Sequence, residues 1–499
     1  MDTTSTAPEE SADLGAAVHE THIGVVLLLG DRAHKLKKPV RTPFLDFSTR
    51  EQRLAALQRE LRLNRRLAPD VYLGLAHVSA LAPDGGPVAG DPAEHVLVMR
   101  RMPAARRLAT LVRSGANVAD DLRALARLVA AFHARADRGP DIAREGRRDA
   151  LRERWQANIA ELQPFRGTIL GTSTVDEIET LTLRFLAGRD PLFADRIADD
   201  RVVDGHGDLI AADVFCLDDG PRVLDCLEFD DRLRYVDALD DVAFLAMDLE
   251  RLCRPDLAAG FLDAYVEFSG DPAPASLRHH YIAYRAVVRA KVACLRHAQG
   301  ETSAAMEAVH HADIALQHLQ AGDVRLVLVG GLPGTGKSTL AGGLADWFSA
   351  VVLSSDRIRK ETAGLDPMTP ATAGFREGLY TPERTEELYA ELLHRARQLL
   401  ERGESVVLDA SWTSQAHRDQ AEALARDTHS HLLQLECRTS TESARQRITH
   451  RVLTPSDATV PVAEAMATAA DPWPDAVPIS TAGTAQESLE LAAAVWRYR

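Results

Sequence analysis

The chain has few cysteines, no long apolar run and no excess of basic residues, and each absence excludes a class of protein. Its 499 residues include five cysteines, an odd number with no C-x-x-C pair, which argues against a disulfide or zinc framework and predicts reduced thiols in a cytoplasmic protein. No stretch of about 18 apolar residues is present, so no membrane span is expected. The formal net charge of −15 argues against general nucleic-acid binding.

The start of the chain also lacks the basic and apolar regions of a signal peptide. Residues 1–18 contain Thr, Ser, Glu and Ala in a mixture that predicts a disordered tail. A chain of this length is expected to form two or three domains, and no repeat at a fixed spacing divides it. A short hinge at 321–323 places the predicted boundary, which gives domains at 19–320 and 321–499.

The clearest signal is a phosphate-binding motif in the C-terminal part. An apolar run over 326–329 predicts a buried strand, and an apolar helical pattern follows the motif. Between them, residues 331–338 read G-L-P-G-T-G-K-S, which matches G-x-x-x-x-G-K-S in the strand–loop–helix context that it requires. Glycines let backbone N–H groups converge on phosphate oxygens, and the helix N-terminus adds partial positive charge. The residues predicted to bind nucleotide here are Gly331, Gly334, Thr335, Gly336, Lys337, Ser338 and Thr339.

Within this motif, Lys337 is predicted to act on the β- and γ-phosphates and Ser338 to bind Mg²⁺. Three further apolar runs, at 351–353, 406–408 and 432–435, complete a predicted parallel sheet. Ligands of such sheets bind at the carboxyl ends of the strands. No N-K-x-D motif is present, which favours ATP over GTP.

Two acidic residues follow strands at that edge of the predicted sheet. Asp356 is predicted to be the general base, and Asp409 is predicted to organise Mg²⁺. The alternative for each is a helix N-cap, a position that aspartate favours. Residues 452–480 contain five prolines and are predicted to be mostly loop.

Arginines are expected to close over the phosphates. Arg447 and Arg451 are four residues apart and share one helical face, where they would stabilise transition-state charge. Arg418 receives the same interpretation. The alternative for all three is a solvated surface position.

The N-terminal part begins with a predicted hairpin over 25–37. Because strand side chains alternate, Lys35 and Lys37 fall on one face of it. A helix over 48–67, opened by an S-T-R-E capping box, contains Glu60. The composition alone favours solvated lysines at a strand edge over ligand-binding ones.

A second cluster of chemistry-bearing residues lies between 204 and 250. His206-Gly-Asp208 is followed five residues later by Asp213, and Asp225 comes after a hairpin predicted at 218–220. This spacing is that of a protein-kinase catalytic loop followed by its metal-binding aspartate. An H-G-D triplet alone often occupies an ordinary turn, but four coincident positions favour a metal-and-base cluster.

These segments resemble two known families. Residues 22–320 resemble the aminoglycoside-phosphotransferase-like kinases, which have a two-lobed protein-kinase-like fold, in the segments DRAHKLKKPV, ELRLNRRLAPDVYLG, GHGDLIAADVFCLDDGPRVLDCLEF and RYVDALDDVAFLAMDLE. Residues from 324 onward resemble the small P-loop kinases, and the order of the halves resembles the fused phosphotransferase/ATP-binding proteins of bacteria. The predicted fold class is therefore an α+β kinase-like domain followed by an α/β P-loop domain with a parallel sheet.

The resemblance implies a role for each matching residue. Asp208 matches the catalytic aspartate that accepts the proton of the substrate hydroxyl, and His206 matches the residue that braces its loop. Asp225 matches the metal-binding aspartate. Either Lys35 or Lys37 matches the lysine that contacts the nucleotide phosphates, and Glu60 is then its helix partner.

The chain departs from the family at Asp213, where the family has asparagine. A carboxylate still binds Mg²⁺, so Asp213 is predicted to be a metal ligand. It also adds negative charge beside the nucleotide and beside Asp208, which weakens the activity expected of the N-terminal half.

The function predicted from the sequence is an ATP- and Mg²⁺-dependent phosphotransferase with two kinase modules that act on small hydroxylated substrates, with neither nucleic acid nor membrane as a partner. One alternative is an N-terminal half that binds a ligand without turnover and regulates the C-terminal kinase. Another is a C-terminal half that acts on nucleic-acid 5′ ends. The sequence identifies neither phosphoryl acceptor, and it leaves the oligomeric state open.

Overall fold

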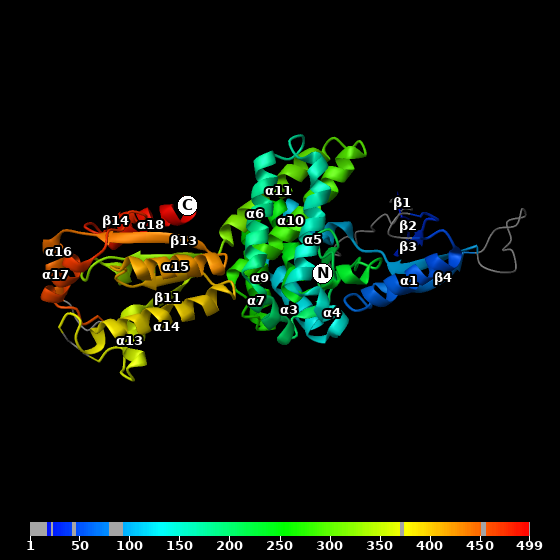
Figure 1. Cartoon of the computed structure of the whole chain (residues 1–499). Helices are drawn as coiled ribbons and strands as arrows, with labels where there is room; N and C mark the ends of the chain where they lie inside the picture. The colour runs from blue at the N-terminus through cyan, green and yellow to red at the C-terminus, as the bar shows by residue number, and fades with distance from the viewer. Residues whose placement is uncertain are drawn as a thin grey trace, which may run out of the picture. The chain divides into compact units, whose positions relative to one another are not determined.

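The computed structural model describes residues 17–20, 23–41, 46–78, 93–369, 374–450 and 456–498 (Figure 1). They divide into two compact units. The first contains residues up to 146 together with 200–272, and the second contains 147–199 and 273–499. Residues 1–16 of the predicted tail lie outside the described residues. The domain boundary at 321 stays a prediction. The two compact units divide the chain at 147, 200 and 273.

The first unit contains a five-stranded antiparallel sheet with the strand order β1-β2-β3-β5-β4. Helix α1 (Arg50–Asn64) packs on β4 and β5, and Leu57 and Leu97 are fully buried in the core between them. The predicted hairpin is confirmed as β2 and β3, whereas β1 and β4 were not predicted. The strands are β1 (Ala17–Glu20), β2 (Gly24–Leu29), β3 (Arg32–Lys37), β4 (Tyr72–Val78) and β5 (Glu94–Arg100).

The start of α1 differs by one residue from the predicted capping box. The N-cap is Thr49, whose hydroxyl accepts from Gln52 N (3.2 Å), while the Gln52 side chain accepts from Thr49 N (3.0 Å). The hydroxyl of Ser48 instead donates to Asp46 (2.6 Å). The box therefore forms with glutamine at its third position, which is equally able to bond back to the cap.

The rest of the first unit carries the segment with the H-G-D triplet. Strands β6 (Val202–Asp204) and β9 (Tyr235–Asp237) pair, and β7 (Val214–Leu217) forms a hairpin with β8 (Gly220–Val223), as predicted for 218–220. Helix α8 (Ala238–Arg251) begins only after β9, because residues 235–237 pair with β6. The helices of this unit are α1, α2 (Leu108–Arg113), α3 (Ala119–Arg135), α4 (Pro140–Glu145), α8 (Ala238–Arg251) and α9 (Pro255–Ser269), with short 3-10 turns η1 (Ala104–Arg106) and η3 (Asp231–Leu233).

Five helices of the second unit precede its sheet in the chain. Trp155 is fully buried among them, where its indole N–H donates to His280 Nε2 (3.1 Å). The buried Arg189 donates to Thr428 O (2.6 Å), and Ser276 Oγ donates to Gly403 O (2.7 Å). These bonds fasten the helices to the α/β part of the same unit. The five helices are α5 (Arg148–Leu162), α6 (Thr172–Ala187), α7 (Asp190–Ala198), α10 (Ala275–Ala298) and α11 (Ala304–Ala321), with the 3-10 turn η2 (Gln163–Phe165).

The C-terminal sheet has five parallel strands in the order β11-β12-β10-β13-β14. The four predicted strands are confirmed, and so is the predicted fold class. The strands are β10 (Arg325–Gly330), β11 (Val351–Ser354), β12 (Val406–Asp409), β13 (His431–Arg438) and β14 (Val477–Ser480); the helices are α12 (Lys337–Phe348), α13 (Ser355–Thr362), α14 (Pro382–Leu400), α15 (Gln415–Asp427), α16 (Thr441–Thr449), α17 (Val460–Ala469) and α18 (Ala485–Tyr498), with η4 (Gly378–Tyr380).

Two of these elements show that the loop predicted over 452–480 is wrong for its described part. Pro461 stands in the first turn of α17, a position where a missing N–H costs nothing. Strand β14 extends the sheet next to β13, and its Ile479 enters the core. The number of prolines predicted a loop, but Pro461 and Pro478 occupy positions that a helix and a strand tolerate.

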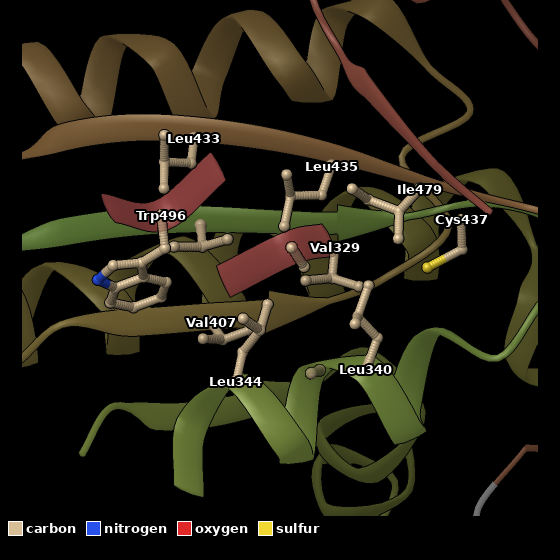
Figure 2. Packing of buried hydrophobic residues seen from close by; sticks show 12 residues of the cluster. Val329, Leu340, Leu344, Val407, Leu433, Leu435, Cys437, Ile479 and Trp496 are labelled. Atoms are coloured by element: carbon tan, nitrogen blue, oxygen red, sulfur yellow. The ribbon is translucent and has the colours of Figure 1, made fainter. Parts of the chain in front are cut away.

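Helices α12 and α18 cover one face of this sheet (Figure 2). Leu340 and Leu344 of α12 point into a cluster with Val329 and Val407 of the central strands, and Trp496 of α18 closes one end of it. This packing fixes α12, and with it the phosphate-binding motif, against the carboxyl end of β10. Among the described helices, none combines the length and the apolar character that crossing a bilayer requires.

Candidate functional sites

The loop between β10 and α12 has the backbone shape of an anion cradle. Gly331, Gly334 and Gly336 have φ angles of 132°, 82° and 90°, a region that residues with a side chain avoid. A Cβ atom on Gly334 would lie 2.5 Å from the carbonyl oxygen of Ala444. The hydroxyl of Thr335 closes the loop with a hydrogen bond of 2.8 Å to the loop backbone. Conformation therefore requires all three glycines, and space also excludes a side chain at Gly331 and Gly334.

The structure brings Lys337, Ser338 and Asp409 together at this loop. Ser338 Oγ donates to Asp409 Oδ2 (2.7 Å), and Lys337 Nζ makes only a long bond of 3.3 Å to Leu332 O. Asp409 ends β12 and is 5% exposed. Burial raises its pKa, and Lys337 and Ser338 oppose that effect. A cation, a hydroxyl and a carboxylate thus meet at the carboxyl ends of two adjacent strands.

A cleft of about 630 Å³ opens in front of this loop. Asp356, in the first turn of α13, is half-buried in the wall of this cleft. Ser354, which ends β11, and Ser355, which begins α13, line the cleft beside it. The cleft therefore unites the predicted base with the phosphate loop. Its lining includes Gly334, Gly336, Lys337, Ser338, Thr339, Asp356, Arg359, Tyr380, Tyr389, Asp409, Arg447 and Met466.

The predicted arginines have three different positions. Arg447 of α16 donates to Thr481 O (2.7 Å) and to Gly334 O (3.5 Å), so it lies against the phosphate loop. Arg451 lies outside the described residues. Arg418 is 6% exposed and donates to Trp412 O and Pro472 O, both at 2.7 Å. Arg418 thus braces the loop after β12 and does not line the cleft.

Two cleft residues were missed in the sequence analysis. The Arg359 guanidinium lies 4.5 Å from the ring centre of Tyr380, and its Nη1 donates to Leu379 O (2.8 Å). Burial and the carboxylates of Asp356 and Asp457 raise the pKa of the Tyr380 phenol, which keeps the phenol a hydrogen-bond donor. Arg359 stands three residues after Asp356 and so shares its helical face, which is the signal that could have identified it.

In the first unit, the H-G-D loop is held by a buried carboxylate on α8. Asp241 accepts hydrogen bonds from His206 N (2.7 Å) and Gly207 N (2.8 Å), and His133 Nε2 lies 3.0 Å from it. Although burial works against the charge, these partners lower the pKa of Asp241. Asp241 was not among the predicted site residues; an aspartate within a largely apolar helical segment was the available signal.

His206 braces the loop as the resemblance implies. Its Nε2 lies 3.1 Å from Leu224 O and donates to it, and its Nδ1 lies 3.4 Å from Asp208 N. Burial lowers the pKa of His206, which favours the neutral ring that this pattern requires. Asp208 is half-buried at the end of this bracing chain.

Asp213 lies close enough to both Asp208 and Asp225 for their charges to interact. Burial, Asp225 and Asp208 raise the pKa of Asp213 well above its usual range. Lys35 lowers the pKa of Asp225, whose side chain is 52% exposed and whose φ is 62°. The carboxyl group at 213 is therefore hard to ionise, whereas that of Asp225 is a ready anion.

Lys35 and Lys37 both reach Glu60, as their shared strand face predicts, but their surroundings differ. Glu60 Oε1 lies 2.7 Å from Lys35 Nζ, and Glu60 Oε2 lies 2.7 Å from Lys37 Nζ. Lys35 also pairs with Asp225 (2.9 Å) and has a side chain 19% exposed, whereas Lys37 pairs with Glu228 (2.6 Å) and is fully buried. Although burial opposes the charge, these carboxylates raise the pKa of both lysines.

The donor atoms at both sites fit a hard cation. Asp213 and Asp225 in the first unit, and Ser338 and Asp409 in the second, offer only oxygen, which Mg²⁺ prefers. Within the described ranges, no three His, Cys, Asp or Glu side chains converge into a metal cluster. Either pair would therefore hold Mg²⁺ together with waters and nucleotide oxygens, the usual arrangement for this ion.

Comparisons with known proteins extend over the whole chain. The uncharacterized proteins Rv2004c of Mycobacterium tuberculosis and Mb2027c of Mycobacterium bovis are each 47% identical over 480 residues, which cover 96% of this chain and 95% of theirs. A family model described as an AAA domain matches residues 326–472.

Two solved structures are similar to separate parts of the chain. A choline/ethanolamine kinase family protein from Mesorhizobium loti is 12% identical, covers 62% of this chain and 94% of its own, and has a TM-score of 0.39. A gluconokinase from Sinorhizobium meliloti is 19% identical, covers 35% and 91%, and has a TM-score of 0.26.

Proposed function

The chain belongs to the protein family of Rv2004c from Mycobacterium tuberculosis, and we propose that it is an ATP-dependent kinase with two sites that phosphorylate hydroxyl groups of small molecules. The observation that carries the proposal is the single cleft in which Lys337, Asp356 and the Ser338–Asp409 pair meet. A cation for phosphate, a base and an oxygen pair for Mg²⁺ are the parts that phosphoryl transfer requires.

In the C-terminal site, the acceptor hydroxyl attacks the γ-phosphorus while the bond to the β-phosphate oxygen breaks and ADP leaves. Asp356 takes the hydroxyl proton, and Lys337 and the backbone N–H groups of the phosphate loop hold the charge that develops on the phosphate oxygens. Ser338 and Asp409 would hold Mg²⁺, which would supply further charge neutralisation. Arg359 and Tyr380 face the acceptor side of the cleft.

A second pocket of about 230 Å³ is a candidate for the base and ribose of ATP. It shares Gly336, Thr339 and Arg447 with the larger cleft, so a nucleotide whose phosphates lie on the loop extends into it. Its other wall includes Thr481 and Thr484 from the loop after β14. Backbone groups of that loop would read the base.

In the N-terminal site, Asp208 is the proposed base, Lys35 the proposed phosphate ligand, and Asp225 with Asp213 the proposed Mg²⁺ ligands. Lys35 takes this role over Lys37 because its side chain alone retains solvent exposure. The alternative, a binding module that regulates the C-terminal kinase without turnover, is favoured by one observation: the carboxyl group at 213 resists ionisation where the related kinases carry a neutral amide.

Transfer of labelled γ-phosphate from ATP to a panel of sugars, nucleosides and aminoglycosides tests the proposal in the full-length chain. We expect Lys337→Ala and Asp208→Asn each to abolish transfer to a different acceptor, and the double variant to transfer to none. Unchanged transfer by the double variant refutes the proposal. If Asp208→Asn alters no transfer although wild type binds ATP at both sites, the regulatory alternative holds for the N-terminal half.

A further inference from the structure

We propose that Lys37 is a positioning residue of the N-terminal site: by binding Glu228 it fixes the segment 225–228, and so holds Asp225 where Lys35 and the nucleotide meet it. The inference rests on the proposed function of that site. Lys35 and Lys37, which lie on one face of β3, then have different roles: Lys35 contacts the nucleotide, and Lys37 fixes the protein segment beside it.

The side chains involved form a continuous chain of ion pairs. In order they are Asp225, Lys35, Glu60, Lys37 and Glu228, joined by contacts of 2.9, 2.7, 2.7 and 2.6 Å. Their exposed fractions are 52%, 19%, 0%, 0% and 10% along the same order. One end of the chain therefore faces solvent, and the other end lies in the interior.

The buried end is suited to holding protein and not ligand. Lys37 Nζ lies between two carboxylates and 5.6 Å from the centre of the Phe47 ring. A nucleotide could reach this ammonium group only by displacing Glu60 or Glu228 from a site without water contact. Removing one partner of a buried ion pair leaves the other charge uncompensated, which is strongly unfavourable.

The segment that Glu228 ends needs such an anchor. Asp225 has a φ of 62°, a left-handed conformation that is unfavourable for a residue with a side chain and persists only where its surroundings enforce it. Four bonds from other segments hold this backbone. Tyr72 OH accepts from Asp225 N (3.1 Å), Asn64 Oδ1 accepts from Cys226 N (2.8 Å), and His206 O accepts from Leu227 N (3.1 Å). In addition, Arg234 Nη1 donates to Leu227 O (2.9 Å). The Lys37–Glu228 contact is the fifth, and it is the ion pair at the end of the segment.

The number and direction of these bonds separate the two lysines. Lys35 holds the side chain of Asp225, which any ligand-induced rearrangement can exchange for another partner. Lys37 holds Glu228, at the end of the segment, and makes no ion pair with the Asp225 carboxylate. Loss of Lys37 should thus loosen the backbone, whereas loss of Lys35 should change the charge at the site.

Amide hydrogen exchange on the full-length chain without nucleotide tests the positioning role directly. We expect Glu228→Gln to raise the exchange of the 225–228 amides by about tenfold or more, because the charged anchor is removed while the shape is kept. Lys37→Met should do the same if it folds, and Lys38→Met, which removes the neighbouring lysine, should match wild type. Exchange at 225–228 that is unchanged in Glu228→Gln overturns the proposal.

Nucleotide affinity provides a second measurement. In a Lys337→Ala background, ATP binding is compared by calorimetry with and without Mg²⁺. We expect Glu228→Gln to lose most of the affinity that Mg²⁺ adds and to keep its Mg²⁺-free affinity within about twofold, because only the ion needs Asp225 in place. Full retention of the Mg²⁺ gain contradicts the positioning role. If the parent binds no ATP at all, the proposed function of this half fails, and the exchange result alone decides the role of Lys37.

Discussion

His280 makes the second unit sensitive to acid. Its ring is 2% exposed, accepts a hydrogen bond from the Trp155 indole (3.1 Å) and stacks on Phe185 at 4.4 Å between ring centres. Burial lowers its pKa from 6.5 to about 3. The folded state therefore binds fewer protons than the unfolded state between these values, so stability falls as the pH decreases below 6.5.

The size of the effect follows from the two pKa values. With 6.5 for the unfolded chain and about 3 for the folded one, this single group lowers the free energy of unfolding by about 2 kcal/mol at pH 5 relative to pH 7.5. At pH 5 most carboxylates remain ionised, so the buried histidines contribute most of the loss between pH 7.5 and pH 5. His279, whose burial beside His318 lowers its pKa to about 4, adds to the loss in the same direction.

His280→Gln tests this reasoning, because glutamine can accept the Trp155 bond and does not titrate. Urea unfolding at pH 7.5 and 5.0, followed by circular dichroism, gives the stability lost on acidification. We expect the variant to lose about 2 kcal/mol less than wild type, and His310→Gln, at an exposed position of α11, to lose as much as wild type. An equal loss in His280→Gln and wild type would show that His280 does not carry the proton.

Three further predictions concern the two sites in the full-length chain. Lys337→Ala should reduce transfer by the C-terminal site on the order of 100-fold or more without lowering the melting temperature, since Lys337 makes only one weak bond in the structure; unchanged transfer would contradict its role. Asp356→Asn should reduce turnover by roughly 100- to 10,000-fold and spare ATP affinity in calorimetry, as for a general base; a loss of affinity instead would make it a ligand of metal or nucleotide. Asp213→Asn should raise ATP affinity of the N-terminal site at about 1 mM Mg²⁺ in the Lys337→Ala background, because metal binding then no longer requires ionising a carboxyl group whose pKa is raised; equal affinity across a Mg²⁺ titration would refute this reasoning.

The phosphate loop could be predicted because its determinants are local. Gly331, Gly334 and Gly336 each take a left-handed conformation within eight residues of sequence, and the flanking apolar runs identify strand and helix. Asp356 and Asp409 were found by the same logic, since strand ends in a parallel sheet meet at one edge. For these residues, sequence spacing already contains the geometry.

Other parts of the sites depend on contacts between distant segments. Asp241 lies 35 residues from His206 in the chain, and only the fold places its carboxylate under the H-G-D loop. Alternation puts Lys35 and Lys37 on one face but cannot separate them, because the difference comes from Glu228, 191 residues after Lys37. The spacing of residues in a sequence predicts which side chains share one face of a helix or strand. It does not predict which residue of a distant helix or strand will contact that face.

The two sites also differ in how far their charged groups are committed before a nucleotide arrives. In the second unit, Lys337 makes one long bond to a carbonyl oxygen and faces an open cleft, so phosphate binding requires little to be broken. In the first unit, Lys35 is already paired with both Glu60 and Asp225. A metal ion at Asp225 would compete with Lys35, and a phosphate at Lys35 would compete with Asp225. One exchange resolves both competitions, because a nucleotide with its metal offers a partner to each. Under the proposed function, we therefore expect binding at the first unit to depend on nucleotide and metal together more strongly than binding at the second, where Lys337 makes one long hydrogen bond to a carbonyl oxygen.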